Sequence, residues 1–130
     1  MIVVDASAML EVLLRTPAAG AVEARLFGGE TLHAPHLLDL EVAQVIRRYE
    51  RGGDLTARRG REALEDFGGF RIERYPHFPF LMRVWSLRAN ATAYDACYLA
   101  LAEALDAPLL TRDGRLASVP GHSAKVEVVS

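Results

Sequence analysis

The sequence is short of cysteine and of long apolar runs, and both shortages exclude classes of protein. With Cys97 as the single cysteine, no intramolecular disulfide can form, and zinc sites built from paired cysteines are excluded. No stretch is long and apolar enough to span a bilayer. The opening MIVVDASAML lacks the basic segment of a signal peptide. We therefore expect a cytoplasmic protein without a membrane segment.

The composition is that of an ordinary globular chain. Its 130 residues, 51% of them hydrophobic and 8% aromatic, predict one domain over residues 1–130. The net charge of −2 is unevenly distributed. Residues 47–88 carry ten arginines and six acidic residues, whereas the segments on either side are net negative. A basic middle between two acidic ends calls for an explanation.

Short apolar runs alternate with amphipathic segments along the whole chain. Strands are expected over residues 2–4, 31–34, 70–75, 108–111 and 126–129. Helices are expected to begin at or just after Ser7, Thr16, Pro35, Thr56, His77 and Thr92, and to end near residues 14, 28, 51, 67, 88 and 105. Because strands alternate with helices, we predict an α/β fold, a three-layer α/β/α sandwich with a mostly parallel central sheet.

Four acidic residues occupy positions where such a sheet carries its functional crevice, beyond the carboxyl ends of the strands. Asp5 ends the first expected strand, and Asp113 follows the strand over residues 108–111. Glu41 and Asp95 lie on helices, on faces whose neighbours at helical spacing are mostly apolar. A lone inward-facing carboxylate is costly, so these groups need a cation, an arginine or a proton. A hard divalent cation would satisfy several of them at once.

Each acid taken alone also has a structural interpretation. Asp5 and Asp95 suit the N-terminus of a helix. Asp113 before Gly114 is an ordinary turn signal, and Glu41 could form a buried salt bridge with an arginine. The four together indicate a site more strongly than any one of them, because each stands at a strand end or on an inward helix face.

Three segments of the chain together resemble the PIN-domain family. They are VVDASAML at the start, DLEVAQVIRR in the first third, and TAYDACYLALAEAL followed by LLTRD near the end. In order and spacing they are similar in particular to the VapC-type toxins of prokaryotic toxin–antitoxin pairs. The resemblance covers essentially the whole chain, and the first and third segments are its more specific parts.

The resemblance implies a metal-dependent endoribonuclease that acts as a toxin and hydrolyses RNA phosphodiester bonds with a metal-activated water. Carried over residue by residue, it implies that Mg²⁺ or Mn²⁺ is held by Asp5, Glu41, Asp95 and Asp113, and that the accompanying hydroxyl groups are those of Ser7 and Thr111. It also implies an antitoxin that docks on helices of the first half, a homodimer, and a toxin–antitoxin hetero-oligomer. We expect Asp5 and Asp95 to be the most direct metal ligands.

The remaining conspicuous residues have two interpretations each. The basic middle either follows an RNA backbone or forms a solvated helix face; its arginines are Arg47, Arg48, Arg51, Arg58, Arg59 and Arg61. Arg112 either pairs with an acid of the site or faces a phosphate. The apolar residues between 18 and 27 suit an interface or the core, as do Phe78, Phe80 and Trp85. Cys97, between apolar neighbours, is expected to be an inert buried thiol.

Two other functions compete with the nuclease. A phosphatase of the haloacid-dehalogenase type would use Asp5 as nucleophile, but it needs an aspartate at position 7 and a nearby lysine. Position 7 is Ser7, and the only lysine is Lys125. A catalytically silent RNA-binding or scaffold module with a PIN-like fold is the other alternative. It predicts no metal-dependent cleavage and no loss of function when Asp95 is removed.

Overall fold

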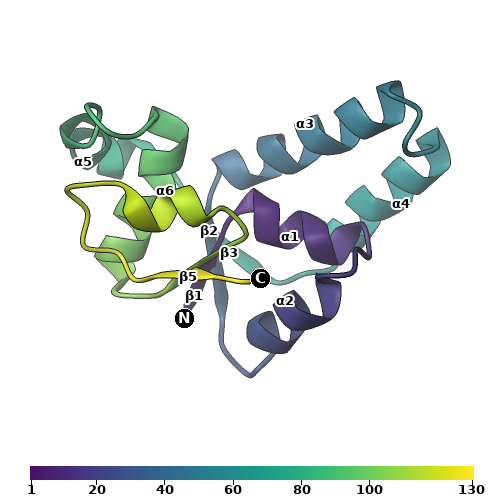
Figure 1. The fold of residues 1–130 in the computed structure, drawn as a ribbon, viewed down its shortest axis with the longest axis horizontal. Coiled ribbons are helices and arrows are strands. Elements are labelled where there is room, and N and C mark those ends of the chain that lie inside the picture. Colours follow the sequence, from purple (N-terminus) through teal and green to yellow (C-terminus); the bar gives the residue numbers. More distant parts are fainter.

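The computed structural model describes residues 1–130 and places a five-stranded parallel sheet between two layers of helices (Figure 1). The strands are β1 (Ile2–Val4), β2 (Leu32–Pro35), β3 (Ile72–Tyr75), β4 (Leu109–Thr111) and β5 (Val126–Val128). The helices are α1 (Ala6–Leu13), α2 (Ala19–Leu26), α3 (Leu37–Arg51), α4 (Ala57–Gly68), α5 (Leu81–Ser86) and α6 (Ala93–Leu105), with 3-10 segments at Phe78–Phe80 and Gly114–Ser118. The predicted three-layer α/β/α fold is confirmed. None of the helices is both long and apolar enough to cross a membrane.

The order of the strands defines where a site can form. Across the sheet the order is β3-β2-β1-β4-β5, so the chain builds outward from β1 in one direction and from β4 in the other. The junction of β1 and β4 is therefore a topological switch point, where open α/β sheets bind their ligands. Val4 pairs with Leu110 in this junction, which brings the next residues, Asp5 and Thr111, side by side.

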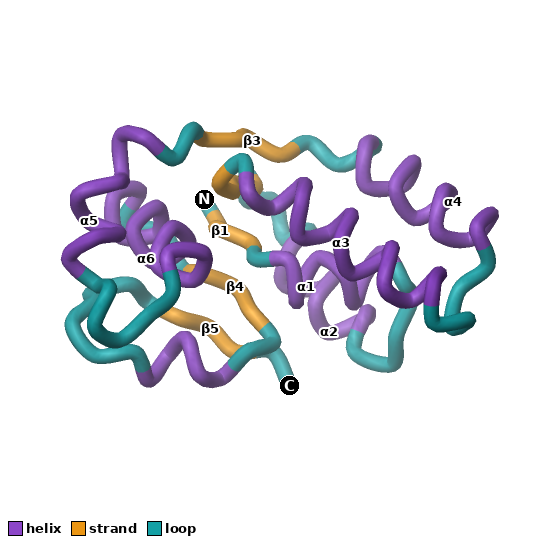
Figure 2. The backbone as a smooth tube through the Cα atoms, turned by 90° about the horizontal axis from the view of Figure 1, so that it is seen from above, coloured by secondary structure: helices purple, strands orange, loops and turns teal.

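Alternation along the strands separates two apolar cores. On β1, Ile2 and Val4 face the cluster formed with α1 to α4, whereas Val3 faces the cluster formed with α5 and α6. Figure 2 shows the strands between these two groups of helices, with α5 and α6 on one side and α1 to α4 on the other. Both layers cover the sheet, which is why its central strands are apolar on both faces.

The caps of two helices agree with the sequence and the cap of a third does not. Thr56 and Thr92 begin α4 and α6 by accepting hydrogen bonds from the third residue along, Arg59 N at 3.0 Å and Asp95 N at 3.1 Å. The prediction that Ser7 caps α1 is wrong, because Asp5 occupies that position and its carboxylate accepts from Ala8 N. The Ser7 hydroxyl instead donates to Asp5.

Two expected helix starts are also wrong, and one expected helix is divided. Thr16 does not begin α2, because its hydroxyl turns back to the Glu11 carboxylate and the helix starts at Ala19 without a side-chain cap. Pro35 does not begin α3; it is the last residue of β2, in register with Tyr75 of β3. The single helix expected over 77–88 is divided into the 3-10 segment Phe78–Phe80, which contains a proline, and the short α5.

Candidate active site

Asp5 is the most enclosed charged side chain of the switch point. It follows β1, caps α1 and is only 7% exposed. Its Oδ1 accepts from Ser7 Oγ at 2.7 Å and from Ala8 N at 3.0 Å, and its Oδ2 accepts from Thr111 Oγ1 at 2.5 Å. Burial raises the pKa of the carboxyl, and the charge of Asp113 adds to this, while the three hydrogen bonds oppose it.

The hydroxyl groups of Ser7 and Thr111 connect the two halves of the site. Their oxygens lie 3.2 Å apart, across the junction of β1 and β4. Ser7 Oγ accepts from Arg112 N at 2.9 Å, and Thr111 Oγ1 accepts from Asp113 N at 2.9 Å. Each hydroxyl thus donates to Asp5 and accepts from the loop after β4, so the position of that loop is tied to the Asp5 carboxylate.

Glu41 reaches the same region from the first turns of α3. Its Oε1 accepts a 2.6 Å hydrogen bond from the hydroxyl of Tyr98, a buried residue of α6. Burial raises the pKa of Glu41, the bond from Tyr98 opposes this, and the charges of Asp5 and Asp95 raise it further. Burial and the Glu41 charge also raise the pKa of Tyr98, so its phenol stays protonated and donates.

Asp95 and Asp113 have opposite electrostatic settings. Asp95 lies in the first turn of α6, where burial and then the charge of Asp113 raise the pKa of its carboxyl. Asp113 follows β4 and caps the 3-10 segment Gly114–Ser118. Its carboxylate accepts two bonds from the Arg115 guanidinium, at 3.0 and 2.7 Å, and these lower the pKa of Asp113.

The four carboxyl groups suit a hard divalent cation. Their charges act on one another, and only Asp113 has a basic side chain as partner. All four offer oxygen, the donor that Mg²⁺ and Mn²⁺ prefer. The side chains are nevertheless not gathered into a ready ligand group: no three His, Cys, Asp or Glu side chains form one. Asp5, Glu41 and Asp113 bind protein donors instead.

Two partners of the acidic residues escaped the sequence interpretation. They are Tyr98, which donates to Glu41, and Arg115, which donates to Asp113. Arg115 stands two residues after Asp113, so local spacing was a usable signal for that pair. The contact between Tyr98 and Glu41 joins residues 57 positions apart, and no local signal points to it.

The arginines expected near RNA divide into two groups. Arg59 donates to the backbone oxygen of Leu13 at 2.6 Å, which joins α4 to α1. The Arg112 guanidinium donates to Val129 O at 2.6 Å and lies 3.6 Å from the Glu11 carboxylate. It therefore pairs with none of the four site carboxylates. The other five are exposed on α3 and α4: Arg47, Arg48, Arg51, Arg58 and Arg61.

The apolar residues of the first half belong mainly to the core. Ala19, Val22 and Leu26 are buried, so they are not available as an interface, while Phe27 is exposed and stacks on Phe70 with ring centres 5.5 Å apart. Phe78 and Trp85, expected in the core or an interface, are 82% and 59% exposed and so lie outside the core.

Comparison with known proteins agrees with this architecture. Residues 2–122 match the PIN domain family. The chain is 44% identical over 130 residues to Ribonuclease VapC12 of Mycobacterium tuberculosis, with 100% of both chains covered. VapBC2 from Rickettsia felis, bound to a DNA fragment from its promoter, has the same fold with a TM-score of 0.75 at 14% identity, covering 100% of both chains. A toxin–antitoxin complex from Klebsiella pneumoniae gives a TM-score of 0.68 at 20% identity, covering 100% of this chain and 98% of that one.

The family match spans nearly the whole chain, and so does the similarity to VapC12. The resemblance that the sequence motifs indicated is thereby confirmed. The chain belongs to the PIN-domain family and, within it, to the VapC ribonucleases.

Proposed function

We propose that the protein is a divalent-metal-dependent endoribonuclease and the toxin of a toxin–antitoxin pair. The observation that carries this proposal is the approach of four acidic side chains to the switch point of the sheet, three of them with raised pKa values and without a basic partner. PIN-domain ribonucleases generally use a divalent metal, and a full-length relative is named a ribonuclease. We assign the whole of residues 1–130 to this one nuclease domain.

The proposed metal ligands follow from the free acceptor positions of the carboxylates. Both oxygens of Asp95 are free of hydrogen bonds, and Oδ2 of Asp5 accepts only one, so these two side chains bind the ion most directly. Asp113 would complete the set if its carboxylate left the Arg115 guanidinium. Glu41 would hold the ion through water or orient the attacking water. When bound, the ion makes water a stronger nucleophile at neutral pH and offsets the phosphate charge.

Ser7 and Thr111 support this chemistry by holding the Asp5 carboxylate in one orientation. The two hydroxyls and the Ala8 N–H occupy both acceptor positions of Oδ1 and one of Oδ2. The remaining position on Oδ2 is left for the ion. A carboxylate fixed in this way needs little reorganisation when substrate arrives.

Cleavage of RNA tests the proposal directly. Purified protein shown to be free of antitoxin is incubated with total cellular RNA in Mg²⁺, Mn²⁺ or EDTA, beside the Asp5→Asn variant. We expect discrete fragments that disappear with EDTA and with Asp5→Asn. Asp106→Asn is the matched control, because Asp106 is exposed and lies outside the site. Its φ of 49° is a conformation that asparagine tolerates. Absence of cleavage in either metal would favour the catalytically silent module.

The exposed arginines of α3 and α4 supply the positive charge that a nucleic acid backbone would follow next to the acidic site. Arg51 lies ten residues beyond Glu41 on the same helix, about 15 Å along its axis. We assign Arg47, Arg48, Arg51 and Arg58 to phosphate contacts. Replacing Arg47 and Arg51 together by glutamine should reduce the salt dependence of RNA binding, whereas an unchanged salt slope would leave these residues as a solvated face.

An antitoxin segment has a suitable cleft next to the acids. Between α1 and α3 a cleft of about 310 Å³ runs from Ser7 and Glu41 to Leu14 and Tyr49, with Glu11 in its wall. Apolar walls with one carboxylate at the end and another along the side fit a helical or extended segment that carries basic side chains. Tyr49→Glu should prevent complex formation with the co-expressed antitoxin and leave RNA cleavage intact. Complex formation by this variant would contradict the assignment.

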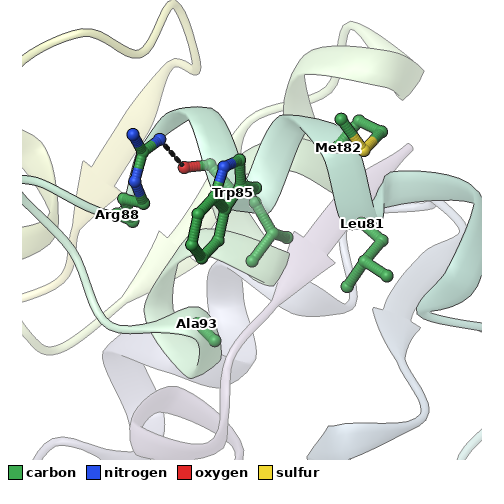
Figure 3. A pocket seen from close by; sticks show the side chains of 6 residues that line it. Leu81, Met82, Trp85, Arg88 and Ala93 are labelled. Carbon is green, nitrogen blue, oxygen red and sulfur yellow. Dashed lines mark hydrogen bonds between the residues drawn. The ribbon is translucent and has the colours of Figure 1, made fainter.

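A second apolar surface lies on the opposite helical layer and fits a homodimer. A hollow of about 490 Å³ is formed by Leu81, Met82, Val84, Trp85, Arg88 and Ala93 (Figure 3). Met82 and Trp85 are 77% and 59% exposed, and the Arg88 guanidinium stacks 4.3 Å from the centre of the Trp85 indole. Solvent-exposed apolar groups of this size mark an association surface.

The dimer proposal is tested by sedimentation. Trp85→Glu combined with Met82→Glu should convert a dimer into a monomer without reducing helical content, because both side chains point to solvent. An unchanged sedimentation coefficient, or a wild-type protein that is monomeric at micromolar concentration, would overturn it.

A further inference from the structure

Tyr98 makes a contact that its burial alone does not require. The side chain is 3% exposed and belongs to the apolar cluster between the sheet and α5–α6, together with Val3 and Leu99. A phenylalanine would fill that position without a polar atom to satisfy. The hydroxyl instead leaves the cluster at its edge and donates a 2.6 Å hydrogen bond to Glu41 Oε1 on α3.

The partners in this bond differ greatly in freedom. The phenol ring is buried in the apolar cluster that contains Val3 of β1 and much of α6, and a tyrosine has only two side-chain torsions, so its oxygen has little freedom. Glu41 is half-exposed, has three torsions and forms no salt bridge. An unrestrained glutamate loses considerable rotamer entropy when it is ordered. The bond therefore restricts Glu41 through a rigid group.

The bond also selects which oxygen of Glu41 remains available. Oε1 is occupied by Tyr98, and Oε2 makes no hydrogen bond within the protein. Val3 of β1 belongs to the same apolar cluster as Tyr98, and Asp5 directly follows the end of this strand. The Tyr98 hydroxyl therefore holds Glu41 in a defined position relative to β1, the strand after which Asp5 follows.

We propose that Tyr98 is a positioning residue of the nuclease site, which holds Glu41 so that its second carboxylate oxygen faces the ion or the attacking water. This inference rests on the proposed metal-dependent function. Removal of a group that hydrogen-bonds to a metal ligand and orients it typically weakens metal binding 10- to 100-fold. Such a role makes Tyr98→Phe a functional change, although it deletes one oxygen from a residue that does not touch the ion.

Direct binding of Mn²⁺ by isothermal calorimetry tests the inference without RNA. Tyr98→Phe should bind Mn²⁺ about tenfold more weakly than the wild type. Tyr75→Phe is the matched control: it removes a hydroxyl that is bonded to His33 Nδ1 at 2.8 Å, outside the proposed site, and should bind Mn²⁺ as the wild type does. Thermal unfolding in EDTA establishes that both variants are folded.

A double-mutant cycle separates positioning from a general loosening of the fold. If Tyr98 acts through Glu41, then Tyr98→Phe has no further effect on Mn²⁺ affinity in a Glu41→Gln background. Equal Mn²⁺ affinity of Tyr98→Phe and wild type, or additive losses in the cycle, would overturn the inference. A wild-type protein that binds no Mn²⁺ would instead overturn the proposed function, so the two failures are distinguishable.

Discussion

Substitution of Thr111 shows how much the hydrogen bonds within the site contribute to the free energy of unfolding. Thr111 is fully buried, and its hydroxyl donates to Asp5 Oδ2 at 2.5 Å while accepting from Asp113 N at 2.9 Å. Thr111→Val keeps the shape of the side chain and removes both bonds. A hydrogen bond to a charged group contributes about 1.5–3 kcal/mol, and the stranded Asp113 N–H adds to the loss. We expect Thr111→Val to lower the free energy of unfolding by about 2–3 kcal/mol.

Thr111→Ser is the control that makes this number interpretable. It retains the hydroxyl and deletes one buried methyl group, which costs about 1 kcal/mol. Urea unfolding in EDTA at pH 7 should therefore rank the wild type above Thr111→Ser, and Thr111→Ser above Thr111→Val. In a thermal scan the valine variant should unfold roughly 8–12 °C below the wild type. A valine variant as stable as the serine variant would refute the role of the hydroxyl.

The loss of stability in Thr111→Val should depend on pH, because the lost bond acts on the pKa of Asp5. The pKa of Asp5 is raised mainly by burial, and the Thr111 bond lowers it, so the valine variant has a still higher Asp5 pKa. A carboxyl whose folded pKa exceeds its unfolded value takes up protons on folding, and the protein loses stability as the pH rises through that interval. The deficit of Thr111→Val should therefore be smaller at pH 4 than at pH 7, and a larger deficit at pH 4 would contradict this reasoning.

Three further predictions concern the charges around the site and the α5–α6 layer. Asp95→Asn should stabilise the metal-free protein at pH 7 by about 1 kcal/mol, because burial and the charge of Asp113 raise the pKa of Asp95. The gain should vanish below pH 3.8, where the carboxyl is protonated in both states. A loss of stability at pH 7 in EDTA would contradict this prediction. Glu103→Gln should lower the free energy of unfolding by about 2 kcal/mol at pH 7, since the bond from Arg83 lowers the pKa of Glu103 to about 2. In urea unfolding, the difference between variant and wild type should disappear as the pH falls from 4.5 towards 2. Arg115→Ala should return the pKa of Asp113 towards its ordinary value in an NMR titration of the carboxyl carbon, and an unchanged titration would show that the ion pair does not persist in solution.

At this site the proposed metal-binding function and the stability of the metal-free fold are in conflict. Asp5, Glu41 and Asp95 are carboxyl groups that the metal-free fold holds at a cost, because burial disfavours their charged forms. The hydrogen bonds from Ser7, Thr111 and the Ala8 N–H offset part of that cost for Asp5. Such an arrangement is stable because a large apolar core surrounds it on both faces of the sheet.

The elements that sequence reasoning placed correctly are those with local causes. The strand over residues 2–4 is a run of β-branched residues, and α4 and α6 begin at threonines that make the expected N-cap bonds. The fold class follows from the alternation of such elements. The errors at Ser7 and Thr16 arose because nearby carboxylates, those of Asp5 and Glu11, accept a hydrogen bond from the hydroxyl that local reasoning had assigned to a cap. Only the error at Pro35 has a distant cause, its pairing with Tyr75 of β3.

The four acids could be selected from the sequence because each occupies a position that is meaningful by itself, at a strand end or on an apolar helix face. What they contact could not be selected in this way. The bond from Tyr98 to Glu41 spans 57 residues, the bond from Thr111 to Asp5 spans 106, and the pairing of Arg112 with Val129 depends on the last strand.

The sequence by itself determined the fold class and the family, and it selected the four acidic residues that we propose for the site, because periodicity, caps and short motifs are properties of neighbouring residues. Only the tertiary structure decided the pairing of β1 with β4 that brings Asp5 beside Thr111, the tyrosine that holds Glu41, and the helices whose apolar residues stay exposed. These features depend on contacts between segments far apart in the chain. Their energies come from burial and hydrogen-bond geometry, which exist only once the segments have packed together.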